Sequence, residues 1–562
     1  MNAWVSSPAS TRTRARGARL FWLAALGAAA CSLSQNGVDP PADTFFYPTS
    51  ALMSPQDAAG SWLYVANSNA DLRFNDGTLL MLNVGDQQLP DAANLTTGGV
   101  LYGAAADRAD TSWGACPQAD YVNPLPRSDA PICCRDLLDT NIINCDERRY
   151  TAPDATVLIG SFAAQMIWQS YCDDPCITAQ DPNAKCSAAA DAGRILIGVR
   201  GDTSLSYVDV VQPTTAASPT INSAPHPAFH CTQGSETLAA SLTECDQKIT
   251  DVASNLNAFA GNNDAPQVPL PDEPYALTLD VPRGYLYVGH LVGSTSVQDT
   301  GGVSLFDASG TGFTATGFPP GPRFIAPFSP PFAANGAGQF GITDLHLHAP
   351  LGQSRMSGTE IYASSRYIPL VSSMVSVGAS VCSGDLNDDV LLPSGDTLNS
   401  GLTGSEMRGV EFMDPPLGSY DFAKRVYALQ RIPPSLVGFD ITQDNAGATI
   451  PIPTSSVETC SSPTFLYQYP TVDGATADNP SRLFVNCFDT GEVYVFDPDG
   501  PTLVTTLQVG RGPAGLVFDG TRPVAYALDF TTSNISVIDL APGSATQYHV
   551  VQRLGFPTVT PR

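Results

Sequence analysis

The chain has 562 residues and a mass of 59.0 kDa, roughly three to four times a typical domain, so it holds several domains or one large repeat architecture. Hydrophobic residues make up 43% of it and charged residues 14%, with 48 Gly and 47 Pro, which indicates a folded, turn-rich chain and excludes a disordered one. The formal charge of -27 argues against nucleic acid as a partner, because phosphate contacts need clustered cationic side chains.

Residues 1–30 are predicted to be a signal peptide. Four arginines, Arg12, Arg14, Arg16 and Arg19, precede the apolar run LFWLAALGAAA at residues 20–30, which is the two-part layout of an export signal. This run is too short to cross a hydrocarbon core as a helix, since that takes about 20 residues. The mature protein is therefore predicted to have no spanning helix.

The apolar run ends at Cys31, which we predict to be a lipid-attachment site. The sequence Ala28-Ala29-Ala30-Cys31 resembles a lipobox, although Ala28 stands where that motif usually has Leu, and it can also be read as an ordinary cleavage site. The chain has 13 Cys, and removing Cys31 leaves an even number that can all pair in an oxidising compartment. Residues 31–43 are then a polar tether, and the expected location is the bacterial outer membrane or cell surface, with a periplasmic or secreted protein as the alternative.

A pair of short apolar segments recurs along residues 44–562. In its clearest copies an aromatic residue or Leu precedes an Asp by 13 positions, and the four pairs are Leu196 and Asp209, Tyr427 and Asp440, Phe484 and Asp497, and Tyr526 and Asp539. Looser copies lie at 62–84, 285–307 and 360–375, and a third segment precedes several pairs, at 274–280, 342–348, 408–414 and 514–519. Alternating strands that recur every 40 to 60 residues predict an all-β chain of four-stranded blades, a β-propeller. Seven copies favour seven blades, and six or eight stay open.

Two segments carry the resemblance to a known family. Trp62-Leu63-Tyr64-Val65-Ala66-Asn67 and Ile535-Ser536-Val537-Ile538-Asp539 resemble the YVTN-type β-propeller repeat. The resemblance implies a propeller, and it leaves function open because such propellers include lactonases, dehydrogenase subunits and surface proteins. The aromatic residue or Leu of each copy is predicted to be buried between blades, and the Asp is predicted to bond turn amides near the surface.

Nine cysteines lie between residues 116 and 245. This density predicts loop insertions around 106–190 and 212–265 that are held by disulfides. A metal or redox site at Cys172, Cys176 and Cys186, or at the vicinal Cys133 and Cys134, is the alternative. Because nine is odd, at least one of them pairs outside the cluster or stays free, and Cys382, Cys460 and Cys487 are the available partners.

Five polar residues are candidates for a site at the mouth of a central channel. Alternation places Asp344, His346 and His348 on one face of a predicted innermost strand, where they could bind a metal, although a role in the channel wall is the default. Arg408 and Glu411 lie on another predicted innermost strand. We predict no metal, no cofactor and no catalytic residue.

The predicted function is that of a lipid-anchored binding or scaffold module whose partner, a protein, glycan or small molecule, the residues do not identify. The alternative is a propeller enzyme of the lactonase or dehydrogenase-subunit type, with its site at the channel mouth. None of the common nucleophile-elbow, Walker, HExxH or CxxCH motifs is present in the sequence, which favours the first reading.

Overall fold

The structure is a computed structural model, and it describes most of the chain between residues 37 and 557. The described ranges are 37–54, 61–85, 99–106, 114–116, 133–152, 155–170, 193–211, 220–221, 224–225, 227–231, 239–250, 270–294, 302–309, 321–328, 339–348, 360–377, 390–413, 424–443, 449–471 and 474–557. The predicted signal peptide, Cys31, Cys172, Cys176, Cys186 and Cys382 lie outside them. Among the described residues, none belongs to a helix of the length and hydrophobicity that a membrane span requires.

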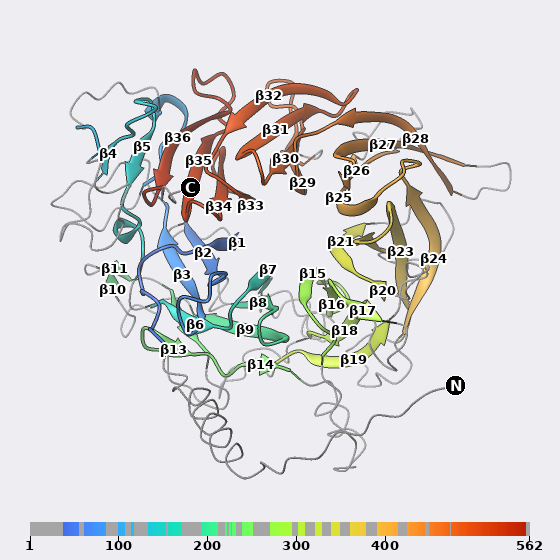
Figure 1. Ribbon diagram of the computed structural model, residues 1–562, viewed down its shortest axis with the longest axis horizontal. Coiled ribbons are helices and arrows are strands. Elements are labelled where there is room, and N and C mark those ends of the chain that lie inside the picture. The colour runs from blue at the N-terminus through green and yellow to red at the C-terminus, as the bar shows by residue number, and fades with distance from the viewer. Residues whose placement is uncertain are drawn as a thin grey trace, which may run out of the picture.

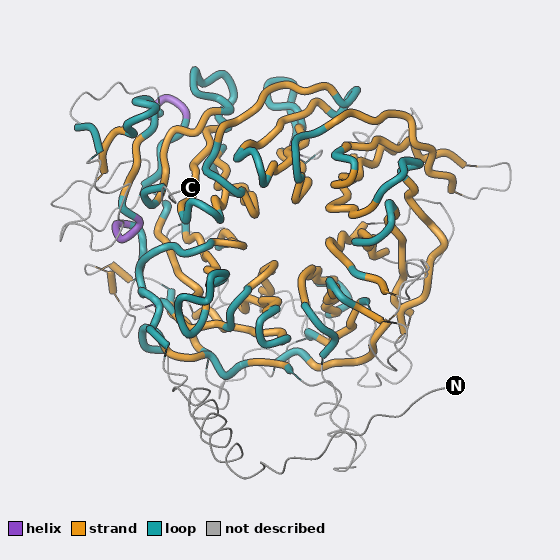
Figure 2. The backbone as a smooth tube through the Cα atoms, in the orientation of Figure 1, coloured by secondary structure: helices purple, strands orange, loops and turns teal. Residues whose placement is uncertain are grey.

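Seven antiparallel blades form a ring, with the first strand of each blade innermost and the fourth outermost (Figures 1 and 2). The first four blades are β1 (Pro48–Met53), β2 (Trp62–Asn67), β3 (Gly77–Asn83) and β6 (Val157–Ile159); β7 (Ala163–Ser170), β8 (Gly193–Val199), β9 (Ser204–Val211) and β12 (Ala228–His230); β15 (Pro274–Asp280), β16 (Tyr285–His290), β18 (Val303–Asp307) and β19 (Arg323–Phe328); and β21 (Ile342–His348), β22 (Glu360–Ser365), β23 (Leu370–Val377) and β24 (Val390–Asn399). The last three are β25 (Ser405–Met413), β26 (Lys424–Ile432), β27 (Ser435–Gln443) and β28 (Thr449–Glu458); β29 (Pro463–Tyr469), β30 (Arg482–Cys487), β31 (Glu492–Asp497) and β32 (Thr502–Gln508); and β33 (Pro513–Phe518), β34 (Val524–Asp529), β35 (Asn534–Asp539) and β36 (His549–Leu554). The predicted seven-bladed, all-β propeller is confirmed.

Short elements outside the blades lie mostly at the periphery of the ring. They are β4 (Cys133–Arg135), β5 (Ile143–Cys145), β10 (Thr220–Ile221), β11 (Ala224–Pro225), β13 (Thr243–Glu244), β14 (Lys248–Ile249), β17 (Gly293–Ser294), β20 (Gln339–Phe340) and the 3-10 turns η1 (Gly103–Ala105) and η2 (Glu147–Arg149). The stretch 106–190, expected to be an insertion, also contains β6 and β7, which are the outer strand of blade 1 and the inner strand of blade 2. The irregular spacing of these two strands hides them from the repeat pattern.

The repeated aromatic residue or Leu is buried between neighbouring blades, as predicted. Leu196, Tyr427 and Tyr526 are 0% exposed and Phe484 is 1% exposed. Each belongs to a core cluster shared with the next blade around the ring, and Tyr526 packs with Leu63 of blade 1. Each blade therefore buries its face only against a neighbour, which makes the ring the unit of stability.

The prediction that the recurring Asp bonds turn amides near the surface is confirmed only in part. Asp539 accepts a hydrogen bond from the Ala541 amide at 2.9 Å, but its side chain is buried. For Asp209 the prediction is wrong in both role and exposure. Its carboxylate forms a fully buried ion pair with Arg194, Nε to Oδ1 at 2.7 Å. The register explains the pairing, because residue 194 at the start of β8 lies directly opposite residue 209 on β9.

The ring is closed from outside by a disulfide-bonded hairpin from the N-terminal half of the chain. Strands β4 and β5 extend blade 7, and β5 pairs in parallel with the outermost strand β36, with Cys145 opposite Leu554 (Figure 1). Asp136, in the β4–β5 turn, pairs with Arg553 at 3.0 Å. We call residues 133–145 the clasp. Blades 1 and 7 are built from opposite ends of the chain. The clasp, which lies between β3 and β6 of blade 1 in the sequence, connects these two ends by pairing with β36 of blade 7.

Four disulfides lie within the described residues, and the first three of these confirm the prediction of stapled loops there. They join Cys116 to Cys134, Cys133 to Cys145, Cys231 to Cys245, and Cys460 to Cys487. The vicinal Cys133 and Cys134 each have a different cysteine partner, which rules out the alternative of a metal or dithiol site at this pair. Cys460 and Cys487 bond to each other and so do not complete the odd cluster.

Candidate functional site

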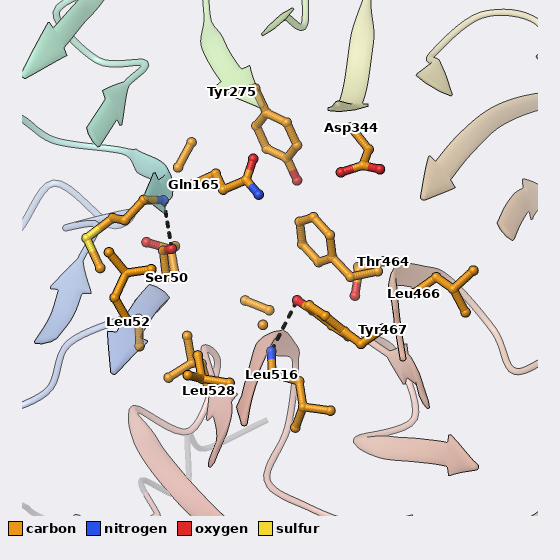
Figure 3. Close-up of a pocket in the computed structure, with 18 of the residues that line it drawn as sticks. Ser50, Leu52, Gln165, Tyr275, Asp344, Thr464, Leu466, Tyr467, Leu516 and Leu528 are labelled. Carbon is orange, nitrogen blue, oxygen red and sulfur yellow. Dashed lines mark hydrogen bonds between the residues drawn. The ribbon is translucent and has the colours of Figure 1, made fainter. Parts of the chain in front are cut away.

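A cavity of about 620 Å³ is lined by the innermost strands of all seven blades. Figure 3 shows Gln165, Tyr275, Asp344 and Tyr467 reaching toward its interior from four different blades. Aromatic and aliphatic side chains supply most of the rest of the wall. In this cavity, residues from all seven blades converge. Its size suits a small-molecule ligand.

Every innermost strand contains a β-bulge near its N-terminal end. The register shifts lie between Pro48 and Ser50, Ala163 and Met166, Pro274 and Ala276, Ile342 and Asp344, Met407 and Gly409, Pro463 and Leu466, and Pro513 and Gly515. A bulge bends the strand and re-aims its side chains. In blades 2, 3 and 6 the bulged residues Gln165, Tyr275 and Phe465 line the cavity.

The polar residues of the channel wall link each blade to the next. An innermost strand is the edge of its sheet, so some of its backbone N–H groups need partners outside the blade. Ser50 accepts from the Met166 amide at 3.0 Å, Gln165 from the Leu277 amide at 2.7 Å, and the Tyr467 hydroxyl from the Leu516 amide at 3.2 Å. Figure 3 draws the first and third of these bonds.

Asp344 and Glu411 play the same role with carboxyl groups. Asp344 receives a hydrogen bond from the backbone of Val410 in blade 5, and Glu411 receives one from the backbone of Gln468 in blade 6. Five of the seven steps around the ring thus carry a side-chain acceptor for an amide of the following blade. We call these five residues, Ser50, Gln165, Asp344, Glu411 and Tyr467, the inter-blade acceptors.

The two carboxyl groups are electrostatically unusual. Burial raises the pKa of Asp344 to about 7, and the hydrogen bonds from Val410 and Leu345 only partly oppose this. Burial, together with the nearby negative charge of Asp344, raises the pKa of Glu411 to about 8, and the hydrogen bond from Gln468 only partly opposes this. Both groups line the cavity, so negative charge is disfavoured there in the protein alone.

The two histidines occupy different positions. His346 lines the cavity, and burial lowers its pKa to about 4, with His348 adding to that shift, so the imidazole is neutral at physiological pH. His348 stacks on Phe412 of blade 5 with ring centroids 3.9 Å apart and is not part of the cavity wall. Alternation places Asp344 and both histidines toward blade 5, but only Asp344 and His346 reach the channel.

Arg408 does not reach the channel wall. It occupies the bulge between Met407 and Gly409, and its guanidinium pairs with Glu406 of the same strand. Of the five predicted candidates, the structure therefore brings together Asp344, His346 and Glu411. Among the described residues, no group of three or more His, Cys, Asp or Glu side chains is arranged to hold a metal ion.

The sequence pattern does not indicate the aromatic part of the wall or the inter-blade acceptors Ser50, Gln165 and Tyr467. Tyr275, Phe465, Tyr467 and Phe518 all line the cavity. A Pro stands at the start of four innermost strands, β1, β15, β29 and β33, and is a sequence signal for them, since Pro is tolerated at the first residue of an edge strand. Nothing in the sequence marks a side chain that bonds the backbone of another blade.

The chain is similar to several solved structures, each at low sequence identity. No family model matches the chain, and no curated protein matches it. The β-propeller domain of Cps50 (Swd1) from Myceliophteria thermophila is similar at 9% identity over 88% of this chain and 96% of that one, with a TM-score of 0.40. A protein provisionally assigned as a 6-phosphogluconolactonase from Bacteroides uniformis is similar at 14% identity over 52% of this chain and 76% of that one, with a TM-score of 0.33. A functionally unknown protein from Desulfotomaculum acetoxidans is similar at 10% identity over 70% and 90% of the two chains, with a TM-score of 0.36.

Proposed function

We propose that this protein is an exported, lipid-anchored β-propeller of the YVTN-repeat type that acts as a binding module and takes its ligand in the central channel. The observation that carries the proposal is the cavity of about 620 Å³ walled by all seven blades. A closed ring fixes this wall, so a ligand would meet pre-positioned side chains at little cost in ordering. The four disulfides are typical of a protein that folds in an oxidising compartment and so support export.

Cys31 provides the test of anchoring. We expect Cys31→Ser to move the mature protein from the membrane fraction to the soluble fraction, because the acyl chains would be lost. Metabolic labelling with a radioactive fatty acid should mark the wild-type protein and not the variant. Membrane partition that is unchanged in the variant would contradict the lipid anchor while leaving the channel proposal intact.

The channel can be tested by filling it. Ala514 lines the cavity, and Ala514→Trp would occupy part of it. Thr506 is exposed on the outermost strand β32, so Thr506→Trp is a matched control. We expect a ligand found by thermal-shift screening of an envelope extract's small molecules to stabilise the wild type and the control but not the channel variant. Equal stabilisation of all three would place binding elsewhere.

The enzyme alternative rests on one specific observation. A carboxyl group with a pKa near neutrality, as Asp344 and Glu411 have, is suited to proton transfer. If the channel is catalytic, Glu411→Gln should abolish turnover of the bound compound, for example opening of a lactone, while retaining its binding. A bound compound recovered unchanged from the wild-type protein would favour the binding module.

A further inference from the structure

The ionisable carboxyl groups of Asp344 and Glu411 are not explained by their structural role. Ser50, Gln165 and Tyr467 accept a neighbouring blade's amide with neutral oxygen atoms. Asn or Gln could serve equally well in blades 4 and 5, because the bond needs only an acceptor oxygen. The two carboxyl groups are therefore a feature of the channel beyond what assembling the ring demands.

No lining cation among the described residues neutralises this pair. Arg200 lines the cavity, but its guanidinium is paired with Glu273, Nη2 to Oε2 at 3.1 Å. His346 has a pKa lowered to about 4 by burial and is neutral at physiological pH. A bound positive charge would favour the ionised form of both Asp344 and Glu411, whose pKa values burial raises.

Aromatic rings from blades 3, 6 and 7 line the cavity together with the carboxyl groups. Tyr275 and Phe465 stack with centroids 6.4 Å apart, and Phe465 lies 6.1 Å from Tyr467. Tyr467 in turn lies 6.3 Å from Phe518. Asp344 and Glu411 line the same cavity as these rings. The faces of such rings attract cations and also exclude water from an apolar ligand.

We propose that the channel binds an organic cation, an amine or quaternary ammonium group attached to an apolar body. Asp344 and Glu411 would supply the charge complement, and Tyr275, Phe465 and Tyr467 would contact the cationic methyl groups and the apolar part. This inference rests on the proposed function, since it names the ligand class for the same cavity. A small metal ion fits less well, because it would leave the aromatic wall without a partner.

Defined probes test the charge requirement directly. Benzyltrimethylammonium carries the cation on an aromatic body, choline carries it on a polar one, and 3,3-dimethyl-1-butanol is the uncharged isostere of choline. We expect calorimetric titration of the full mature protein at pH 8 to show binding of benzyltrimethylammonium, weaker binding of choline, and at least tenfold weaker binding of the isostere. Benzoate should not bind.

Conservative variants separate charge from structure. The double variant Asp344→Asn, Glu411→Gln keeps both acceptor oxygens for the amides of blades 5 and 6 and removes only the charge. It should fold and bind benzyltrimethylammonium at least tenfold more weakly. Asp499→Asn removes an exposed carboxylate outside the channel and should bind as the wild type does. Phe465→Leu should weaken binding of the aromatic cation more than that of choline.

The outcomes separate the two proposals. Equal binding of cation and isostere, or wild-type affinity in the double variant, would overturn the cation inference. Binding of calcium in preference to the organic cations would overturn it as well. If Ala514→Trp abolishes binding of an uncharged ligand while no cation binds, the channel function stands and the cation inference fails. If no compound binds in the channel, both fail.

Discussion

Cys145 and Leu554 lie opposite each other in a parallel strand pair that joins the N-terminal half of the chain to its last blade. The pair is reinforced around it: the Gln552 amide nitrogen donates to the Tyr150 hydroxyl at 2.7 Å, and its oxygen accepts from the Leu101 amide at 2.9 Å. Because Cys145 is also bonded to Cys133, the clasp is cross-linked next to the strand that it holds.

Opening the clasp should destabilise the whole ring. We expect the double variant Cys133→Ser, Cys145→Ser to lower the free energy of unfolding by about 2 to 4 kcal/mol, as is typical for loss of a native disulfide. Urea titration with and without reductant measures this. Arg553→Ala, which removes the partner of Asp136 without touching a cysteine, should lower stability in the same direction. Wild-type stability in both variants would show that the hairpin is not a clasp.

Equivalent ion pairs in two blades should differ sharply in their contribution to the free energy of unfolding. Arg194 and Asp209 are 2% and 0% exposed, whereas Arg425 and Asp440 are each 32% exposed. Arg194→Ala removes the arginine partner of a buried carboxylate and should cost about 3 to 5 kcal/mol. Arg425→Ala should cost about 1 kcal/mol or less, because water screens that pair. Chemical denaturation measures the loss of unfolding free energy in each variant. Comparable losses in the two would show that burial does not set the contribution of these ion pairs.

The packing between blades predicts which apolar residues contribute most to stability. Phe484 is 1% exposed and contacts Phe518 of the next blade, with ring centroids 5.2 Å apart. Phe484→Ala should cost about 3 to 5 kcal/mol. Leu503 is 49% exposed on the outermost strand of the same blade, so Leu503→Ala should change stability by about 0.5 kcal/mol at most. Thermal melting of the two variants side by side makes the comparison.

The channel carboxyl groups should make stability fall as pH rises. Asp344 and Glu411 have folded pKa values of about 7 and about 8, above their ordinary values of 3.8 and 4.5. Between about pH 4 and pH 8 the folded state therefore binds more protons than the unfolded state, and each increase in pH favours unfolding. We expect a loss of several kcal/mol from this pair across that interval, because each pH unit that separates a folded from an unfolded pKa corresponds to about 1.4 kcal/mol.

The matching variant isolates this effect from the other titrating groups. Asp344→Asn, Glu411→Gln should be more stable than the wild type at pH 8 and should approach it at pH 5. Unfolding free energies at a series of pH values give the difference curve. A difference that is constant with pH would mean that these two groups do not have raised pKa values.

The pattern of residues along the chain determined the blades, because each four-stranded unit is built from local contacts between neighbouring strands. Alternation and the 13-residue spacing located all seven central strand pairs and the buried positions Leu196 and Tyr526, since side chains of a strand must alternate between two faces. The same logic placed Asp344, His346 and Glu411 on innermost strands, where they line the cavity.

Only the tertiary structure decided what joins one blade to another. Pairing of Cys145 with Leu554, the bond from the Leu277 amide to Gln165, and the diversion of Arg408 to Glu406 all depend on bulges or on segments far apart in the chain. A one-residue bulge re-aims a side chain without changing the hydrophobic pattern, and a long-range pair leaves no periodicity to detect. For this reason the sequence specified a ring of blades, while the closure of that ring and the chemistry of its channel came from the fold.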